Sequence, residues 1–298
     1  MKIAITGATG FIGRYIVRKL NAKGQDCRCW YRSESRCFDS ATDGTTIDWI
    51  PGELGSTAAC EDLLKGCDAV VHSGLHRAGD KFQGGEGNIE EFVQKNVLGS
   101  IQLIEAARAA KVSKFVFIST CAVHDKILND RPLDESHPLW MTTHYGAHKA
   151  AVEQFVHSYG FGIGFPIVAL RPTGVYGLHH KPKRSKWYDI VQNIAAGNDV
   201  DCSRGGKEVH AADVAEATDI LLHSHGNAGE VYSCYDRYIS EHEVATIAKQ
   251  ITGSSATING NVPAPKNQIV SDKIRGLGMQ FGGDDLLTST VQDIVNSL

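Results

Sequence analysis

The sequence contains no apolar run long enough to span a bilayer, which takes about 20 consecutive residues. It also has no excess of basic side chains, because 30 lysines and arginines stand against 34 aspartates and glutamates, a formal net charge of −4. Such a balance provides no electrostatic attraction to nucleic acid or to an anionic membrane surface. We therefore expect neither a nucleic acid nor a membrane among the partners of this chain.

Paired-cysteine motifs are missing as well. None of the eight cysteines forms a Cys-x-x-Cys pair, and several lie in apolar stretches, among them Cys27, Cys29 and Cys67. Buried free thiols of this kind are typical of proteins in a reducing compartment. The first predicted strand begins at Lys2, which leaves no room for a signal peptide. We therefore expect a cytoplasmic protein with reduced cysteines.

The sequence also lacks a set of residues with metal-ligand spacing. His144 and His148 stand four residues apart on a predicted helix, as in some zinc sites, but no glutamate or third ligand accompanies them. We expect no metal and assign both histidines to the surface or to a cleft.

What the sequence does contain is a glycine-rich turn at its start. The stretch Met1–Gly13 reads as a short buried strand, a turn with glycines three residues apart, and a helix with apolar residues at helical spacing. Between a strand and a helix, such glycines let the backbone approach a pyrophosphate at the positive end of the helix. The residues predicted to hold a dinucleotide here are Gly7, Thr9, Gly10, Phe11, Ile12 and Gly13.

Strands and helices then alternate along the chain. Strands are predicted at 27–32, 46–50, 68–72, 115–120 and 167–170, with long helices at 89–111 and 144–159. Alternation of this kind predicts an α/β fold with a doubly wound parallel (Rossmann) sheet. The less regular remainder, with helices near 209–225, 240–251 and 282–298, predicts a smaller C-terminal α/β substrate lobe. We expect residues 1–173 to form the dinucleotide-binding domain and 174–298 the substrate lobe, partly interleaved with the sheet.

Ligands of doubly wound sheets bind in a crevice at the carboxyl ends of the strands. Gly10, Arg32, Ser73, Thr120 and Arg171 all fall at or just beyond predicted strand ends, so one crevice could collect them. Further cofactor contacts are expected from Glu53, Leu54, Gly74 and Pro172.

The spacing of Tyr145 and Lys149 brings a phenol and an amine to one face of a helix, one turn apart. Deprotonating a phenol at neutral pH costs roughly 4 kcal/mol, and a nearby ammonium lowers that cost. Such a tyrosine can exchange a proton with an alcohol or carbonyl as hydride moves to or from a nicotinamide. Tyr15 and Lys19 have the same spacing, but Tyr15 shares the apolar face of the first helix, so we interpret that pair as structural.

Several stretches together resemble the extended short-chain dehydrogenases/reductases, specifically the NAD-dependent epimerase/dehydratase family of nucleotide-sugar enzymes. These stretches are TGATGFIG (6–13), NVLGS (96–100), STCAVHD (119–125), LRPTGVYG (170–177), EVHAADVAEA (208–217) and DKIRGLG (272–278). The resemblance implies a catalytic set of Thr120, Tyr145 and Lys149, with Ser119 beside Thr120 and Lys149 also binding the cofactor. It further implies that Asn96 supports the lysine through water, and that a helix face near Val152–Tyr159 could form a homodimer rather than core.

Two departures from the family's sequence pattern restrict the range of substrates and reactions that we expect. Its dehydratases carry an acidic residue soon after the catalytic threonine, where this chain has Cys121 and Ala122, so sugar dehydration is not expected. Members that bind nucleotide-sugars carry an arginine where this chain has Gly205–Glu208, with Arg204 and Lys207 as imperfect substitutes. A second diphosphate arginine has no counterpart around 263–270. A free sugar, a sugar acid or another small hydroxy-carbonyl compound therefore becomes plausible.

The end of the second strand indicates which cofactor is used. NAD-selective members have an acidic residue there, but this chain has Tyr31 followed by Arg32, with Arg36 nearby. A guanidinium suits a 2′-phosphate, so NADP is favoured over NAD. In the alternative, Arg32 stacks on adenine and Glu34 reaches the ribose.

Three functions stay open. The first is an NAD(P)-dependent oxidoreductase acting at a C–OH or C=O of a sugar-like substrate. The second is a nucleotide-sugar C4-type epimerase with tightly bound NAD, and the third a non-catalytic dinucleotide sensor. The basic segment 179–186 is either a solvated loop or a site that captures an anionic group, and His76 and His124 are candidate cleft residues.

Overall fold

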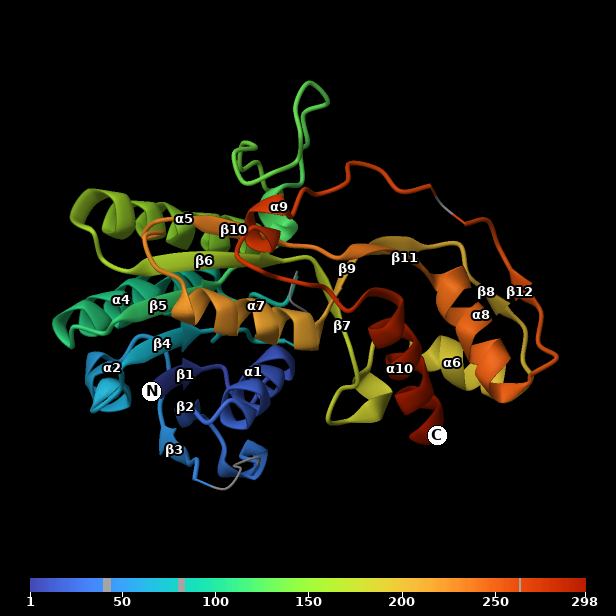
Figure 1. Ribbon diagram of the computed structural model, residues 1–298, viewed down its shortest axis with the longest axis horizontal. Helices are drawn as coiled ribbons and strands as arrows, with labels where there is room; N and C mark the ends of the chain where they lie inside the picture. The colour runs from blue at the N-terminus through green and yellow to red at the C-terminus, as the bar shows by residue number, and fades with distance from the viewer. Residues whose placement is uncertain (40–43, 80–83, 263) are drawn as a thin grey trace.

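The computed structural model describes residues 1–39, 44–79, 84–262 and 264–298, and its centre is a seven-stranded parallel sheet (Figure 1). The spatial order of the strands is β10-β6-β5-β4-β1-β2-β3. Their bounds are β1 Lys2–Thr6, β2 Asp26–Tyr31, β3 Ile47–Pro51, β4 Ala69–His72, β5 Lys114–Ile118, β6 Ile167–Pro172 and β10 Val231–Cys234. The chain winds outward in both directions from β1 and β4, which is the topology predicted from the sequence, and a ligand crevice opens at such a point of reversal.

Helices cover both faces of this sheet. One core contains side chains of α1 (Phe11–Ala22) and α7 (Ala211–His223) together with one face of the strands. The other contains side chains of α2 (Thr57–Leu64), α4 (Gly99–Ala109) and α5 (His144–His157). Because every central strand is buried on both faces, β5 and β6 read as continuous apolar runs, which is why the sequence predicted them clearly.

The helix predicted over 89–111 is not uniform. It consists of α3 (Ile89–Val93), a π-helical turn at Gln94–Leu98, and α4. A second π-helical turn, Ser158–Gly162, extends α5 beyond its predicted end. A single inserted turn shifts which side chains face the sheet, and hydrophobic spacing alone does not reveal it.

The C-terminal part forms a smaller lobe at one end of the molecule (Figure 1). Its three-stranded sheet has the order β11-β9-β7, with β7 Gly174–Tyr176, β9 Gly205–His210 and β11 Arg237–Ser240. Packed with it are α6 Tyr188–Ala195, α8 Glu241–Thr252 and α10 Gly283–Asn296, with a two-stranded pair β8 Val200–Asp201 and β12 Ile258–Asn259. The short helix α9 Asp272–Arg275 packs instead against β10 of the large sheet, and its Ile274 is part of that sheet's core. The start predicted for α8 is confirmed, because Ser240 Oγ accepts a hydrogen bond from the backbone amide of Glu243 at 3.1 Å.

The two parts share segments. After β9, α7 returns to the large sheet, packs beside α1 and leads to β10 at its edge. No helix in the described part of the chain is both long and apolar enough to cross a membrane. All eight cysteines are free and six are buried.

Candidate active site

The turn after β1 needs glycine for reasons of space and of backbone conformation. Gly7 has φ +73°, and a Cβ added there would lie 2.6 Å from the carbonyl carbon and oxygen of Ser73. A Cβ on Gly13 would overlap the carbonyl oxygen of Gly7. The turn and the end of β4 are tied together, because Ser73 Oγ donates to the Thr6 carbonyl at 2.8 Å. The Gly74 amide donates to Thr6 Oγ1 at 3.0 Å.

The N-terminus of α1 opens directly from this turn. Its N-cap residue, Gly10, is exposed and provides no side-chain cap. The first amides of the helix, from Phe11 to Gly13, have no carbonyl one turn earlier to bond. No acidic side chain stands in this turn. Uncapped amides at the positive end of a helix, beside a glycine that lets the backbone come close, fit the pyrophosphate of a dinucleotide.

The segment after β2 is held by an arginine that the sequence analysis did not single out. Arg14 Nη2 donates to the carbonyl of Arg36 at 2.6 Å, and its guanidinium lies 4.2 Å from the ring centroid of Phe38. Arg32 is exposed on this segment. Glu34 accepts a hydrogen bond from the Tyr31 hydroxyl at 3.0 Å. The position of Arg14 in the first turn after the glycines is the signal that could have identified it.

The remaining predicted cofactor residues lie beyond other strand ends. Glu53 is exposed and pairs with Lys95 at 3.3 Å, and Leu54 is buried against Gly99. Pro172 is buried as the last residue of β6. All of these segments follow the carboxyl ends of parallel strands, so they border the same edge of the sheet.

Thr120, Tyr145 and Lys149 come together at this edge. Thr120 follows β5, and its Oγ1 accepts a hydrogen bond from the backbone amide of Ala122 at 3.1 Å. Tyr145 lies in the first turn of α5 and shares a side-chain hydrogen bond with Thr120. Lys149 follows one turn later, where its Nζ donates to the Ile118 carbonyl at 2.7 Å and lies 4.6 Å from the Phe117 ring centroid.

The pKa values of Tyr145 and Lys149 both depend most on burial. Burial raises the pKa of Tyr145, while the hydrogen bond from Thr120 and the charge of Arg77 lower it. Burial lowers the pKa of Lys149 to about 7, partly opposed by Glu153. The lowering of the phenol's pKa by Lys149 stays a prediction.

Ser119 and Arg171 both bind a buried carboxylate. Ser119 Oγ donates to Glu153, and Arg171 binds the same carboxylate with Nε at 3.0 Å and Nη2 at 2.7 Å. Glu153 is 0% exposed and Arg171 1% exposed, and Arg171 Nη1 lies 3.2 Å from His124 Nε2. This ion pair joins β6 to α5, and the catalytic role of Ser119 stays a prediction.

Asn96 holds the loop after β4. Its Nδ2 donates to the carbonyls of His76 and Phe92, both at 2.9 Å, and its Oδ1 accepts the His76 amide at 2.8 Å. The predicted water-mediated support of Lys149 by Asn96 stays a prediction. Beneath this loop, His72 Nδ1 lies 2.7 Å from Thr6 Oγ1 and His72 Nε2 lies 2.8 Å from Ser100 Oγ. Burial and the charge of Lys149 lower the pKa of His72 to about 3.

On the substrate side, Cys121 cannot act as an acid at neutral pH. Its Sγ donates to the Arg171 carbonyl at 3.0 Å, and burial raises its pKa to about 12. Lys207 interacts electrostatically with Cys121, and burial lowers the pKa of its amine. Arg204, by contrast, is exposed and pairs with Glu241 at 3.2 Å. Of the two suggested substitutes for the diphosphate arginine, Lys207 interacts with the residue next to Thr120, whereas Arg204 binds Glu241 of α8.

The two histidines of the basic segment lie over the start of α1. His179 stacks on Phe11 with ring centroids 5.5 Å apart, and His180 stacks on His179 at 4.1 Å. Burial lowers the pKa of both, to about 4 for His180. The two histidines thus pack on the start of α1, whereas Lys181, Lys183 and Arg184 are exposed.

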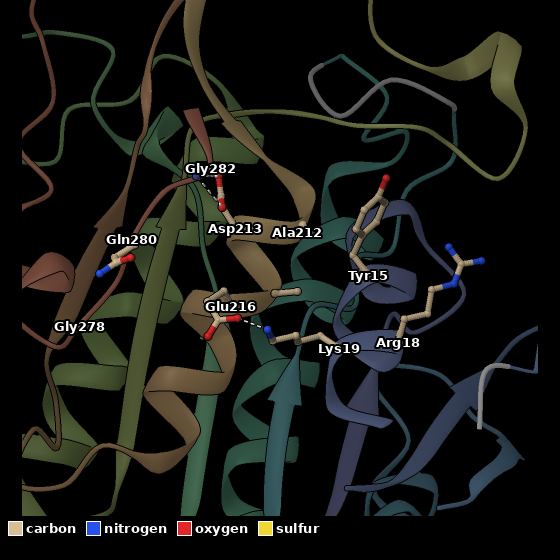
Figure 2. A pocket seen from close by; sticks show the side chains of 10 residues that line it. Tyr15, Arg18, Lys19, Ala212, Asp213, Glu216, Gly278, Gln280 and Gly282 are labelled. Atoms are coloured by element: carbon tan, nitrogen blue, oxygen red, sulfur yellow. Dashed lines mark hydrogen bonds and ion pairs between the residues drawn. The ribbon is translucent and has the colours of Figure 1, made fainter. Parts of the chain in front are cut away.

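Tyr15 and Lys19 lie apart from this site, as the sequence indicated. Figure 2 shows them with Arg18 in a groove between α1 and α7, where Lys19 forms an ion pair with Glu216. The Tyr15 hydroxyl donates to the Leu178 carbonyl at 2.9 Å. His148 is buried against Phe92, with ring centroids 5.0 Å apart. Among the described residues, no group of three or more potential metal ligands is assembled.

Comparison with known proteins places this arrangement in a family. The model of the NAD dependent epimerase/dehydratase family matches residues 3–234. A dTDP-D-glucose 4,6-dehydratase of Mus musculus is 36% identical over 266 residues, which cover 84% of this chain and 72% of that protein. A trifunctional UDP-glucose 4,6-dehydratase/3,5-epimerase/reductase of Arabidopsis thaliana is 28% identical over 265 residues. The match covers 84% of this chain but only 38% of the plant protein's length.

A solved structure shares the whole fold. The UDP-glucose 4-epimerase of Thermus thermophilus, in complex with NAD, covers 100% of both chains with a TM-score of 0.79 at 22% identity. At this identity the likeness concerns the fold alone. The family model is decisive because it spans the glycine turn, the Thr120–Tyr145–Lys149 group and β9. This chain belongs to the NAD dependent epimerase/dehydratase family.

Proposed function

We propose that this chain is an NAD(P)-dependent oxidoreductase that transfers hydride at a C–OH or C=O of a sugar or a sugar-like hydroxy-carbonyl compound. The observation that carries the proposal is the hydrogen bond between Thr120 and Tyr145, with Lys149 one helical turn away. These side chains stand at the same edge of the sheet as the glycine turn. A non-catalytic dinucleotide sensor would have no need for this set.

When bound, the nicotinamide dinucleotide supplies the acceptor or donor of hydride. Thr120 donates a hydrogen bond to the reacting oxygen of the substrate and orients it. Tyr145 takes the proton of the substrate hydroxyl in the oxidative direction and returns it to the carbonyl oxygen in the reductive direction. Without substrate, the single O–H of Thr120 bonds Tyr145 and, with the charge of Arg77, lowers the pKa of the phenol, while burial raises it. When substrate binds, this O–H turns to the reacting oxygen. Lys149 holds the cofactor ribose, for which its amine would exchange one hydrogen bond to Ile118 for another.

For the cofactor we propose that the amides of Phe11–Gly13 and the Gly7–Gly10 turn bind the pyrophosphate, with Thr9 beside them. Arg32 binds the 2′-phosphate, which favours NADP over NAD, since Arg32 is exposed and Glu34 is engaged by Tyr31. The remaining contacts are assigned to Glu53, Leu54, Ser73, Gly74 and Pro172. Residues 1–173 would thus hold the cofactor and 174–298 most of the substrate.

We also propose a cytoplasmic homodimer. Val93, Leu98 and Phe155 expose 42%, 47% and 38% of their surface on α3, the π-helical turn and α5. These are neighbouring elements, and exposed apolar side chains on them support a face that a second copy would cover. Size-exclusion chromatography with light scattering tests this directly, and a monomer at micromolar concentration contradicts it.

The experiment that tests the function is a screen of sugars, sugar acids and hydroxy-ketones with NAD(H) and NADP(H), read at the nicotinamide absorbance band. A net oxidoreductase changes the absorbance with exchangeable cofactor. A C4-type epimerase, which the shared epimerase fold keeps as the second candidate, retains NAD through purification and shows no net change. No reaction with any compound and either cofactor, by an enzyme that binds the cofactor, contradicts the proposal.

A further inference from the structure

One carboxylate in the substrate lobe has an unusual setting. Glu208 pairs with Gly174 across the β7–β9 register, and Gly206 is on the same face of β9, two residues before it. A Cβ added to Gly174 would lie 2.5 Å from Glu208 Oε2, and one added to Gly206 would overlap Glu208 Oε1. Neither glycine has a positive φ. The carboxylate of Glu208 therefore fills the space that side chains at both positions would need.

The two oxygens of this carboxylate are not equivalent. Glu208 is 3% exposed, and its Oε1 accepts a hydrogen bond from Lys186 Nζ at 2.5 Å. Its Oε2 is buried and has no hydrogen-bond partner in the part of the chain that the structure describes. Leaving a buried charged acceptor unpaired costs about 1–3 kcal/mol or more. Because Gly174, which adjoins Oε2, is exposed, a ligand that lies over Gly174 can bring the missing donor.

This carboxylate lies beside a segment that follows the strand next to Thr120. Gly174 is two residues beyond Pro172, the end of β6, and β6 pairs with β5, which leads into Thr120. Lys207, next to Glu208 on β9, interacts with Cys121, the neighbour of Thr120. Because successive side chains of a strand point to opposite faces, Lys207 lies on the face of β9 that interacts with Cys121, and Glu208 on the face beside Gly174.

We propose that Glu208 forms a substrate subsite that accepts a hydrogen bond from a hydroxyl or ammonium group and excludes a diphosphate. The substrate is then a free sugar or amino sugar rather than a nucleotide-sugar. This inference deepens the proposed function and rests on it. An ionised carboxylate only accepts hydrogen bonds, and so does a diphosphate at neutral pH. Two acceptors of like charge cannot pair, and their repulsion is stronger where water is displaced.

The first test measures binding without turnover. Uridine diphosphate is titrated calorimetrically into the protein saturated with NADP⁺. We expect the native chain to bind uridine diphosphate with a dissociation constant above about 1 mM. Glu208→Gln, which keeps the shape, removes the charge and adds N–H donors, should bind at least about tenfold tighter, a difference of about 1.4 kcal/mol. Asp189→Asn is the matched control, since it removes an exposed carboxylate from α6 of the same lobe and should change the affinity less than about twofold.

Micromolar binding of uridine diphosphate by the native chain, or no gain in Glu208→Gln, overturns the proposal. Gly174→Ala provides a second variant if Glu208→Gln does not fold. Its methyl group meets Oε2 without changing any charge, so uridine diphosphate should still not bind while the subsite is blocked.

The second test measures turnover with D-glucosamine, D-glucose and D-glucuronate as probes. For the native chain we expect the lowest KM for D-glucosamine and the highest for D-glucuronate. Both Glu208→Gln and Gly174→Ala should raise the KM for D-glucosamine about tenfold and change kcat less than about threefold. KM values that do not rise from D-glucosamine through D-glucose to D-glucuronate contradict the proposal that Glu208 binds the substrate. If none of the three is oxidised, the proposed function is in question, and the binding test still decides the role of Glu208.

Discussion

The Nζ of Lys149 lies 2.7 Å from the carbonyl oxygen of Ile118, the last residue of the strand that leads to Thr120. The amine is therefore bound to the sheet, and Lys149 is only 4% exposed. Burial lowers the pKa of Lys149 to about 7. A lysine whose charge is this costly to bury affects stability as well as catalysis, and the effect depends on pH.

The first prediction concerns the stability of Lys149→Met. Below pH 7 the native lysine is charged in both the folded and unfolded states, so folding has to bury the charge. Between about pH 7 and its unfolded pKa near 10.5, only the unfolded state binds the proton, and the stability of the native chain rises with pH. Methionine carries no such charge. The stability of Lys149→Met relative to the native chain should therefore be greatest below pH 7 and fall by several kcal/mol by about pH 10.

Urea unfolding at pH 6, 7, 8, 9 and 10 measures this difference, in which other titrating groups cancel. Arg77→Met serves as a control, because an arginine stays charged throughout this range. A stability difference between Lys149→Met and the native chain that is constant with pH would mean that Lys149 titrates normally.

The second prediction separates two tyrosines with the same sequence spacing. Tyr145→Phe removes the hydroxyl that bonds Thr120, so turnover should fall at least about a thousandfold while cofactor affinity is kept. Tyr15→Phe removes only the hydrogen bond to Leu178, so it should cost about 1 kcal/mol of stability and leave turnover within about twofold. Steady-state rates and cofactor titrations on both variants check this. Equal losses of turnover in the two variants would show that Tyr145 is not the proton-transfer residue.

Much of the fold could be predicted because its determinants are local. A strand buried on both faces shows as an apolar run, as in β5, and the glycines of the first turn are required by the space around Gly7 and Gly13. The family, the doubly wound sheet and the NAD-type cofactor followed from these features and are confirmed. The proposed site residues Thr120, Tyr145 and Lys149 could be picked out as candidates for the same reason, since Thr120 follows β5 and the other two lie in the first turns of α5.

What the sequence could not reveal depends on contacts between distant segments. Ser119 and Arg171 read as crevice residues because both follow buried strands, but both bind Glu153 of α5. The space occupied by Glu208 results from a pairing between residues 174 and 208 that no local pattern encodes. The groups that set the pKa of Tyr145, including Arg77, likewise come from loops far along the chain.

The third prediction compares the two adjacent hydroxyls after β5. Ser119→Ala leaves one oxygen of Glu153 without its hydroxyl donor in a fully buried ion pair, so stability should fall by about 1–3 kcal/mol. Its kcat should change less than about threefold. Thr120→Ala removes the bond to Tyr145 and should lower kcat about a hundredfold. Unfolding curves and kcat for both variants provide the measurement, and a larger loss of kcat in Ser119→Ala than in Thr120→Ala would reverse the assignment.

The fourth prediction concerns which dinucleotide is bound. Arg32 is exposed after β2, so Arg32→Ala should weaken NADPH about ten- to a hundredfold and NADH less than about threefold, since only NADPH carries the 2′-phosphate. Arg14→Ala is the contrasting variant. Arg14 holds the same segment through the Arg36 carbonyl and the Phe38 ring, so its loss should weaken both cofactors by similar factors. Quenching of tryptophan fluorescence on titration with each cofactor gives the four affinities. Equal losses of NADPH and NADH in Arg32→Ala would assign the guanidinium to adenine stacking and make NAD the better candidate.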